Sequence, residues 1–297
     1  GDIAVSSADQ HGLTAAEPNL RWLRQHSAGL DVQVDDISEE IAALAIQGPT
    51  SGALLRNVVH GDIPSLKYFR VISGTIAGAK VDISRTGYTG DLGYEVWMSR
   101  ADAMKVWDAI VAHGPDHGLK PAGMLALDVA RIEAGLLLTD VDFFSARKAL
   151  TASQLYSPFE IGLGRLVDFN KENFIGRSAL AAENAVAPRR RIVGVSFDWP
   201  AVEKLYEAVG LPPMTQATAS RVAIPVFAGG KQIGRMTSST WSPVLKQMIG
   251  LATVSAAHAA AGTKLEVEHT VDVVRHRVPA TVVPTPFFDP ARKTAKI

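Results

Sequence analysis

The glycine-rich stretch that runs from Arg85 to Glu95 constrains this chain more than any other segment. Within it stand three glycines, two tyrosines and a terminal carboxylate: Gly87, Gly90, Gly93, Tyr88, Tyr94 and Glu95. Glycine adopts backbone angles closed to other residues and lets a ligand approach the main chain, while tyrosine rings and a carboxylate offer stacking faces and acceptors. The stretch therefore predicts a binding loop. An ordinary β-hairpin is the alternative, because a Gly-Asp turn between β-prone segments is typical of hairpins.

Other short motifs follow in order along nearly the whole chain. They are Gln47-Gly48-Pro49, Pro121-Ala122-Gly123 with Arg131-Ile132-Glu133-Ala134-Gly135, Ser157-Pro158 with Glu160-Ile161-Gly162-Leu163, Phe174-Ile175-Gly176-Arg177, and Thr237-Ser238 with Thr240-Trp241-Ser242-Pro243. Together with the glycine-rich stretch, they resemble the signature blocks of the aminomethyltransferase family, which includes the glycine-cleavage T-protein and folate-dependent demethylases. The resemblance implies an α+β fold, with a multi-domain T-protein-like folate-binding body followed by a C-terminal antiparallel β-barrel. It also implies that the first part of the family's opening domain is missing upstream.

The character of the chain changes near Pro188. Downstream, strand-like runs alternate with glycine-rich or polar turns, a pattern typical of a small antiparallel barrel or sandwich, and Gly229-Gly230 is the clearest hairpin turn. We therefore expect a folate-binding, aminomethyltransferase-like region over residues 1–185 and a β-barrel domain over residues 186–297. The tail after Asp289 is expected to be peripheral.

Composition excludes several kinds of partner and site. Thirty basic residues balance thirty acidic ones, so no overall field favours nucleic acid or an anionic membrane. The absence of cysteine excludes disulfides and cysteine-based metal sites, and argues against the iron–sulfur assembly branch of the superfamily, whose signature carries a cysteine. The histidines lack the spacing of a metal site, and no run reaches the length of a membrane span. We expect no metal and a cytoplasmic location.

By the resemblance, Tyr88 and Glu95 hold tetrahydrofolate. A reduced pterin presents an N–H and an amino group side by side, and a carboxylate matches that pair with two parallel hydrogen bonds. In the family, the glutamate that closes the GYE triplet binds the pterin and the tyrosine of GYTG helps to hold the folate. The alternative for Glu95 is a strand residue paired with an arginine such as Arg85.

The family's chemistry moves a one-carbon unit to N5 of tetrahydrofolate, with an aspartate of an Asp-Asp pair beside the reacting nitrogens. Asp2 is the candidate for that catalytic aspartate, and its alternative status is a frayed terminal residue, with the family aspartate upstream of the chain. Without the acid, folate binding could persist while transfer is lost, because orientation supplies a large share of such catalysis.

Asp91 replaces the glutamate usual in the family and is expected to be a turn residue. Two other features bear on the donor. Leu127 stands where glycine-cleavage T-proteins often carry arginine. Residues after the next helix, Asp140, Asp142 and Phe143, look more like the demethylase branch. These positions favour a small-molecule donor over the aminomethyl-lipoyl arm of a carrier protein.

Several further residues carry two interpretations each. Asp128 and Arg131, three apart on a predicted helix, are expected to form a solvated pair, although in the family this helix packs close to the folate cavity. The run from Arg189 to Arg191 is expected to be hydrated, the alternative being attraction of a polyglutamate tail or an acidic carrier. Trp241 either lines the cavity or anchors the barrel.

The sequence as a whole predicts a tetrahydrofolate-dependent one-carbon transferase of the aminomethyltransferase or demethylase type. It would move a methyl or aminomethyl carbon from a small donor, or from a lipoyl carrier protein, to N5 of tetrahydrofolate. The alternative is a truncated or divergent folate-binding or interaction module without turnover.

Overall fold

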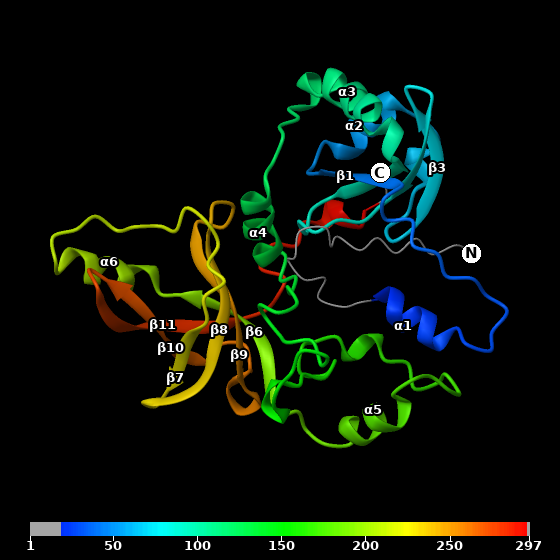
Figure 1. Ribbon diagram of the computed structural model, residues 1–297. Coiled ribbons are helices and arrows are strands. Elements are labelled where there is room, and N and C mark those ends of the chain that lie inside the picture. The colour runs from blue at the N-terminus through cyan, green and yellow to red at the C-terminus, as the bar shows by residue number, and fades with distance from the viewer. Residues whose placement is uncertain (1–18, 296–297) are drawn as a thin grey trace. The chain divides into compact units, whose positions relative to one another are not determined.

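The computed structural model describes residues 19–295 (Figure 1), which form two compact units. The first unit comprises residues 19–122 together with 289–295, and the second comprises residues 123–288. The mixed helix and strand content confirms the predicted α+β class. No helix within the described part is long and apolar enough to cross a membrane.

A five-stranded antiparallel sheet forms the frame of the first unit. Its strand order is β1 (Ile41–Gln47), β5 (Gly93–Ser99), β4 (Ala79–Ser84), β3 (Val71–Ile76) and β2 (Val59–His60). Successive side chains of a strand point to opposite faces, so β5 directs Tyr94, Val96 and Met98 to the core and leaves Glu95 and Trp97 on the other side. The side away from the core is called the outer face below.

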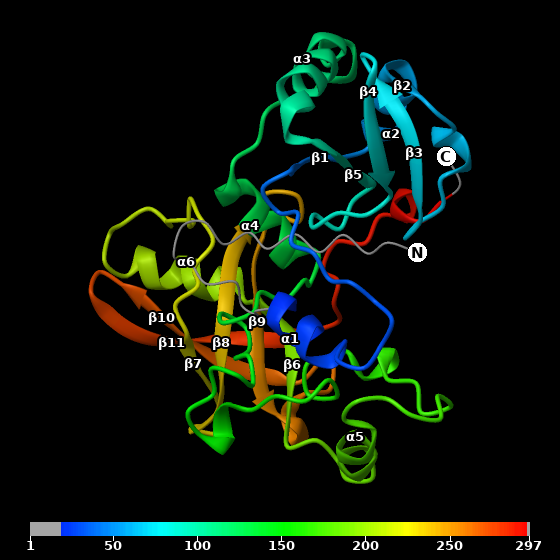
Figure 2. The ribbon, with the colours of Figure 1, turned by 45° about the vertical axis from the view of Figure 1, so that its right-hand side comes forward.

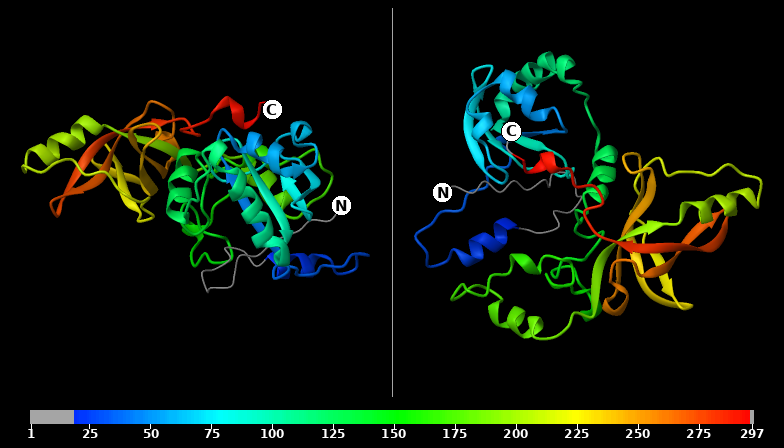
Figure 3. Two further views of the ribbon diagram at one scale, coloured as in Figure 1. Left: turned by 90° about the horizontal axis from the view of Figure 1, so that it is seen from above. Right: turned by 180° about the vertical axis from the view of Figure 1, so that it is seen from behind.

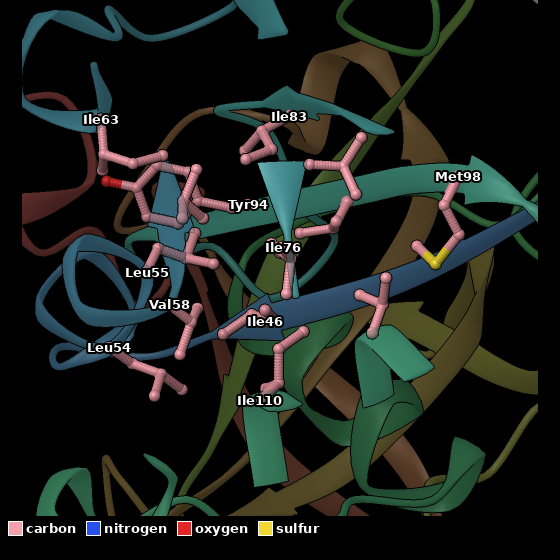
Figure 4. Packing of buried hydrophobic residues seen from close by; sticks show 14 of the residues in the cluster. Ile46, Leu54, Leu55, Val58, Ile63, Ile76, Ile83, Tyr94, Met98 and Ile110 are labelled. Atoms are coloured by element: carbon pink, nitrogen blue, oxygen red, sulfur yellow. The ribbon is translucent and has the colours of Figure 1, made fainter. Parts of the chain in front are cut away.

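Two helices contribute to the core of the first unit, α2 (Ser51–Val58) and α3 (Ala103–His113). Leu54, Leu55 and Val58 recur at helical spacing on α2, and all three are buried. They pack with Ile76 and other strand residues in one cluster (Figure 4). This burial on one side of the sheet leaves the outer face available for a site. Helix α1 (Asn19–His26) precedes the sheet and buries no residue.

A closed antiparallel barrel dominates the second unit and confirms the predicted C-terminal barrel. Its strand order is β10 (Lys264–Val271), β11 (Val274–Val283), β6 (Arg190–Phe197), β9 (Gln247–Ser255), β8 (Lys231–Ser242) and β7 (Ile224–Ala228). Figure 3 shows these strands from two sides, in colours from yellow-green to red. Gly229 and Gly230 have positive φ angles of 55° and 79° and join β7 to β8, which confirms the predicted hairpin turn.

Three helices belong to the second unit, α4 (Met124–Glu133), α5 (Arg177–Asn184) and α6 (Trp199–Glu207). Asp198 caps α6 by accepting a hydrogen bond from the backbone N–H of Ala201, and the helix buries Val202 and Tyr206 in the barrel's hydrophobic cluster. The compact units divide at residue 123. The domain division predicted near residue 186 stays a prediction, and it lies just before the first barrel strand.

The tail after Asp289 is mostly exposed, in keeping with the expectation of a peripheral segment, but it also makes specific contacts that the sequence did not predict. Residues 289–295 belong to the first unit, where they contact the glycine-rich stretch from the far end of the sequence. Because these contacts join positions about two hundred residues apart, no local pattern in the sequence indicates them.

Candidate functional site

The outer face of the first unit carries two rows of side chains that cross the sheet. One row is Ala45, Glu95, Ser84 and Val71, and the next is Ala43, Trp97, Asp82 and Ser73. Most of these residues line a cavity of about 950 Å³. Small and polar neighbours surround two carboxylates, Glu95 and Asp82, and one indole, so the face combines open space with charged acceptors and an aromatic surface.

Glu95 is half-buried, and its hydrogen bonds engage one of its two oxygens. Oε2 accepts from the hydroxyl of Thr86 at 3.0 Å and from that of Ser84 at 3.4 Å. No residue between 19 and 295 donates a hydrogen bond to Oε1. These hydroxyls orient the carboxylate from one side and leave an acceptor for a ligand. Sequence reasoning missed Ser84, Thr86 and Trp97, which strand alternation from Glu95 and its cross-strand neighbours could have found.

The alternative in which Glu95 pairs with Arg85 is wrong. Arg85 is 3% exposed, and its guanidinium donates to backbone carbonyls, among them those of Lys293 at 3.1 Å and Ala295 at 2.6 Å. Arg85 and Glu95 stand ten positions apart in the sequence, but backbone carbonyls of the C-terminal residues accept the hydrogen bonds of the buried guanidinium. Glu95 is therefore free of an arginine partner among the described residues.

The two tyrosines of the glycine-rich stretch have different surroundings. Tyr88 lies half-buried in the loop between β4 and β5. Tyr94 is fully buried in the core, and this burial raises the pKa of its phenol, an effect that the nearby Arg85 charge partly offsets. Tyr94 is adjacent to Glu95 in the strand and so points to the opposite face. The expectation that Tyr94 offers a stacking surface is wrong.

Gly87 and Gly93 leave room for the side chain of Gln47 rather than for a ligand. A Cβ at Gly87 would lie 2.0 Å from Oε1 of Gln47, and one at Gly93 would lie 1.9 Å from it. The amide of Gln47 donates to the carbonyl of Tyr94 at 3.1 Å and accepts from the hydroxyl of Thr89 at 3.0 Å. The Gln-Gly-Pro motif therefore locks into the glycine-rich stretch and shapes the loop that holds Tyr88.

Asp128 and Arg131 form a buried pair, so the prediction of a solvated pair is wrong. Arg131 is 1% exposed, and it contacts Asp128 at 2.9 Å and Asp142 at 2.6 Å. It also donates to the hydroxyl of Ser238 on β8 at 2.8 Å. The two carboxylates and the guanidinium satisfy one another away from water, as buried charges must. These contacts fasten α4 to the barrel.

A second contact between the same elements involves Glu133, which accepts from the hydroxyl of Ser242 at 2.5 Å. The Arg-x-Glu-Ala-Gly motif and the Thr-Trp-Ser-Pro block therefore meet in space. Trp241 of that block lies against Trp199 of α6, with ring centroids 4.7 Å apart. Trp241 thus packs within the second unit, as part of the barrel's own structure.

The arginine run is not uniformly hydrated. Arg190 stacks over the ring of Tyr156, with the guanidinium carbon 3.7 Å from the ring centroid, and its Nε lies 3.2 Å from a carboxylate oxygen of Glu160. Its neighbours Arg189 and Arg191 are exposed. The prediction of a hydrated run is correct for these two and wrong for Arg190, which has a structural role.

The predicted catalytic Asp2 lies outside the described residues. Within residues 19–295, no group of three or more His, Cys, Asp or Glu side chains is placed to hold a metal ion. The outer face instead offers a carboxylate acceptor, hydroxyls and an indole, which suit an uncharged heterocycle with N–H donors.

Two family models match the chain. The GCVT N-terminal domain matches residues 10–171, and the glycine cleavage T-protein C-terminal barrel domain matches residues 207–289. Aminomethyltransferases of Bacillus pumilus and Geobacillus thermodenitrificans are 36% and 37% identical over 278 residues, which is 93% of this chain and 68% of each relative. The chain thus spans about two thirds of the length of these relatives.

The fold is also similar to a solved structure. The crystal structure of the glycine cleavage system aminomethyltransferase T from Bartonella henselae superimposes with a TM-score of 0.72 and 22% sequence identity, over 91% of this chain and 65% of that one. The shared fold and the two family models agree with the match to aminomethyltransferases at 36% identity. The chain therefore belongs to the aminomethyltransferase family, a family of transferase enzymes that includes the glycine cleavage T-protein.

Proposed function

We propose that this protein is a tetrahydrofolate-dependent one-carbon transferase and that tetrahydrofolate binds on the outer face of the first unit. The name of its relatives favours transfer of an aminomethyl group, which a lipoyl carrier protein or a small molecule would deliver. The balanced charge and the absence of cysteine are compatible with work in the cytoplasm.

The observation that carries this proposal is the arrangement of Glu95. Its Oε2 is held by Thr86 and Ser84, while Oε1 has no donor among residues 19–295. A pterin edge would supply an N–H and an amino group to this carboxylate, and hydrogen bonds to an ionised acceptor are stronger than neutral ones. The residues present therefore fit the pterin.

Two neighbours support the same assignment. Trp97 lies two residues along β5 on the same face, where its indole offers a flat apolar surface to a bound ring. The cavity of about 950 Å³ lies within the usual range for small-molecule sites, roughly 300–1,000 Å³. Tyr88 would hold the folate from the adjoining loop, as the resemblance implies.

When bound, tetrahydrofolate would supply a nucleophilic nitrogen that accepts the carbon. The contribution of this chain is to hold the pterin and to orient it toward the donor, which converts a bimolecular encounter into a positioned one. An aspartate would assist at the reacting nitrogens, and Asp2 remains the candidate for it within this chain.

The binding test is calorimetric titration of the chain with tetrahydrofolate under anaerobic conditions. We expect Glu95→Gln to weaken binding at least tenfold, about 1.4 kcal/mol, because the new amide group places a donor against the pterin donors. Asp82→Asn is the matched control, since Asp82 lines the same cavity one row away. It should change the affinity by less than about twofold.

Two results would contradict the assignment. A folded parent that fails to bind tetrahydrofolate would remove the site altogether. Equal losses in Glu95→Gln and Asp82→Asn would indicate a general effect of charge on this face rather than a specific pterin contact.

Turnover is tested separately with two classes of donor, an aminomethyl-lipoyl carrier and small methylated amines or ethers. Mass spectrometry of the folate product distinguishes a methylene from a methyl adduct and so identifies the type of transfer. Binding without either product, in the parent and in Asp2→Asn alike, would support a folate-binding module without turnover.

A further inference from the structure

The chain ends by returning to the first unit after the barrel is complete. Beyond β11, residues 289–295 include a short 3-10 helix, Ala291–Lys293, and form the C-terminal segment, drawn in red in Figure 2. This segment contacts the glycine-rich stretch at two positions, Arg85 and Asp91, which lie on either side of Tyr88.

At Asp91 the contact is a bidentate ion pair. Nε and one terminal nitrogen of Arg292 donate to the two oxygens of Asp91, each at 2.7 Å. The planar fork of a guanidinium matches a carboxylate in this way and fixes its direction as well as its distance. Asp91 is thus more than the turn residue that the sequence predicts.

At Arg85 the C-terminal segment accepts hydrogen bonds from a buried cation, whose Nε has no partner among the described residues. The Arg85 side chain donates to the carbonyls of Arg292, Lys293 and Ala295 and, on the body of the unit, to that of Leu66 at 3.3 Å. No carboxylate among residues 19–295 contacts this guanidinium. A buried charge is costly unless it is hydrogen-bonded, so most of its compensation comes from the C-terminal segment.

Arg85 is also joined to the proposed pterin acceptor through the next residue. Thr86 donates its hydroxyl to Oε2 of Glu95 at 3.0 Å and contacts the hydroxyl of Ser84 at 2.6 Å. A shift of the backbone at Arg85 would therefore move the group that orients the Glu95 carboxylate.

From these contacts we infer that the C-terminal segment is a positioning element for the folate site, in which Arg292 fixes the Tyr88 loop through Asp91 and the last carbonyls fix Thr86 through Arg85. The inference rests on the proposed function, because it concerns the same site. In this inference the residues of the C-terminal segment act through Tyr88, Thr86 and Glu95.

The test uses Asp91→Asn, Arg292→Gln and the double variant, with Arg100→Gln as the control. Arg100 belongs to the same unit and makes an exposed contact with Glu39 at 3.9 Å, remote in sequence from the glycine-rich stretch. For each variant, tetrahydrofolate affinity is measured by calorimetry, hydrogen exchange is measured in peptides that span residues 85–95, and thermal unfolding is recorded without ligand.

We expect each single variant to weaken tetrahydrofolate binding about threefold to tenfold and to speed exchange of residues 85–95, while the melting temperature changes little. The double variant should lose about as much affinity as either single variant, because both single changes remove the same ion pair between Asp91 and Arg292. A purely structural role would lower the melting temperature without this separate loss of affinity.

Three outcomes would count against the inference or against the proposed function. If the parent binds tetrahydrofolate and the variants change neither affinity nor exchange, the segment does not position the site and the proposed function stands. If the losses in the double variant simply add, Asp91 and Arg292 do not act as a pair. A parent that binds no tetrahydrofolate contradicts the proposed function instead. In that case, unchanged hydrogen exchange of residues 85–95 in the variants would also show that the C-terminal segment does not fix the Tyr88 loop.

Discussion

Replacing Arg131 with methionine should destabilise the second unit by about 3 kcal/mol, the lower end of the range for breaking a buried ion pair. The guanidinium lies in the interior between Asp128 and Asp142, and it carries the hydrogen bond from α4 to Ser238. Methionine fills much of the same volume, so the expected loss reflects charge and hydrogen bonding rather than a cavity.

The size of the expected loss of stability depends on which ion-pair and hydrogen-bond partners Asp128 and Asp142 keep when Arg131 is replaced. Asp128 retains Arg221, whose Nε lies 2.8 Å from Oδ2. Asp142 is fully buried and loses its cationic partner, but it keeps donors from Thr237 at 2.7 Å, Ser238 at 2.6 Å and the N–H of Leu138 at 2.8 Å. These remaining hydrogen bonds partly compensate the Asp142 charge, which is why we expect about 3 rather than 5 kcal/mol.

Hydrogen exchange of amides in β8 and β9 measures this loss directly, because it reports the opening free energy of the barrel apart from that of the first unit. Arg275→Met is the matched control, since Arg275 is exposed and its Nε is 3.8 Å from Glu268; it should cost less than about 1 kcal/mol. Asp142→Asn should recover part of the loss in the Arg131→Met background. A single Arg131→Met variant within about 1 kcal/mol of the parent would refute the reasoning.

Three further predictions concern other positions. Gly93→Ala should destabilise the first unit by about 1–3 kcal/mol in denaturant unfolding, because its Cβ meets Gln47, and Gln47→Ala should relieve most of this cost. Burial, with a smaller contribution from His276, lowers the pKa of His269 below its ordinary value of 6.5. The folded state therefore binds fewer protons than the unfolded state, and stability should fall as the pH drops through 6.5. His269→Phe should flatten this dependence of stability on pH in denaturant unfolding at several pH values. Val273 is 94% exposed with φ of 59°, a left-handed conformation that costs a non-glycine residue roughly 1–2 kcal/mol. Glycine removes this strain but loses roughly 0.5–1 kcal/mol through its more flexible unfolded chain, so Val273→Gly should stabilise the chain by about 0.5 kcal/mol in denaturant unfolding.

The barrel and the outer-face carboxylate could be predicted because their signals are local. Strand-like runs and the Gly229-Gly230 turn are short-range patterns, and backbone conformation at a two-residue turn depends mainly on those residues. Alternation along β5 likewise determines that Glu95 and Tyr94 face opposite ways. The same alternation places Tyr94 in the core, away from any stacking surface on the outer face.

The errors arose where long-range contacts decide the environment of a side chain. Asp128 and Arg131 have the spacing of a solvated helical pair, yet β8 and the Asp142 loop cover them. Gln47 and Gly93 belong to separate motifs. The pairing of β1 with β5 places the side chain of Gln47 over the backbone of Gly93. Such burial depends on which elements pack together, and helical or strand periodicity carries no information about that choice.

The sequence by itself determined the family, the barrel and the residue types of the candidate site. The reason is that motif order, strand alternation and turn formation depend on residues that lie close together in the sequence. Tertiary structure alone decided that the last residues return to Arg85 and Asp91, and that Arg131 joins a helix to the barrel. The physical reason is that a buried charge needs partners in three dimensions, and the carbonyls and carboxylates that satisfy it are brought together by folding from distant parts of the chain.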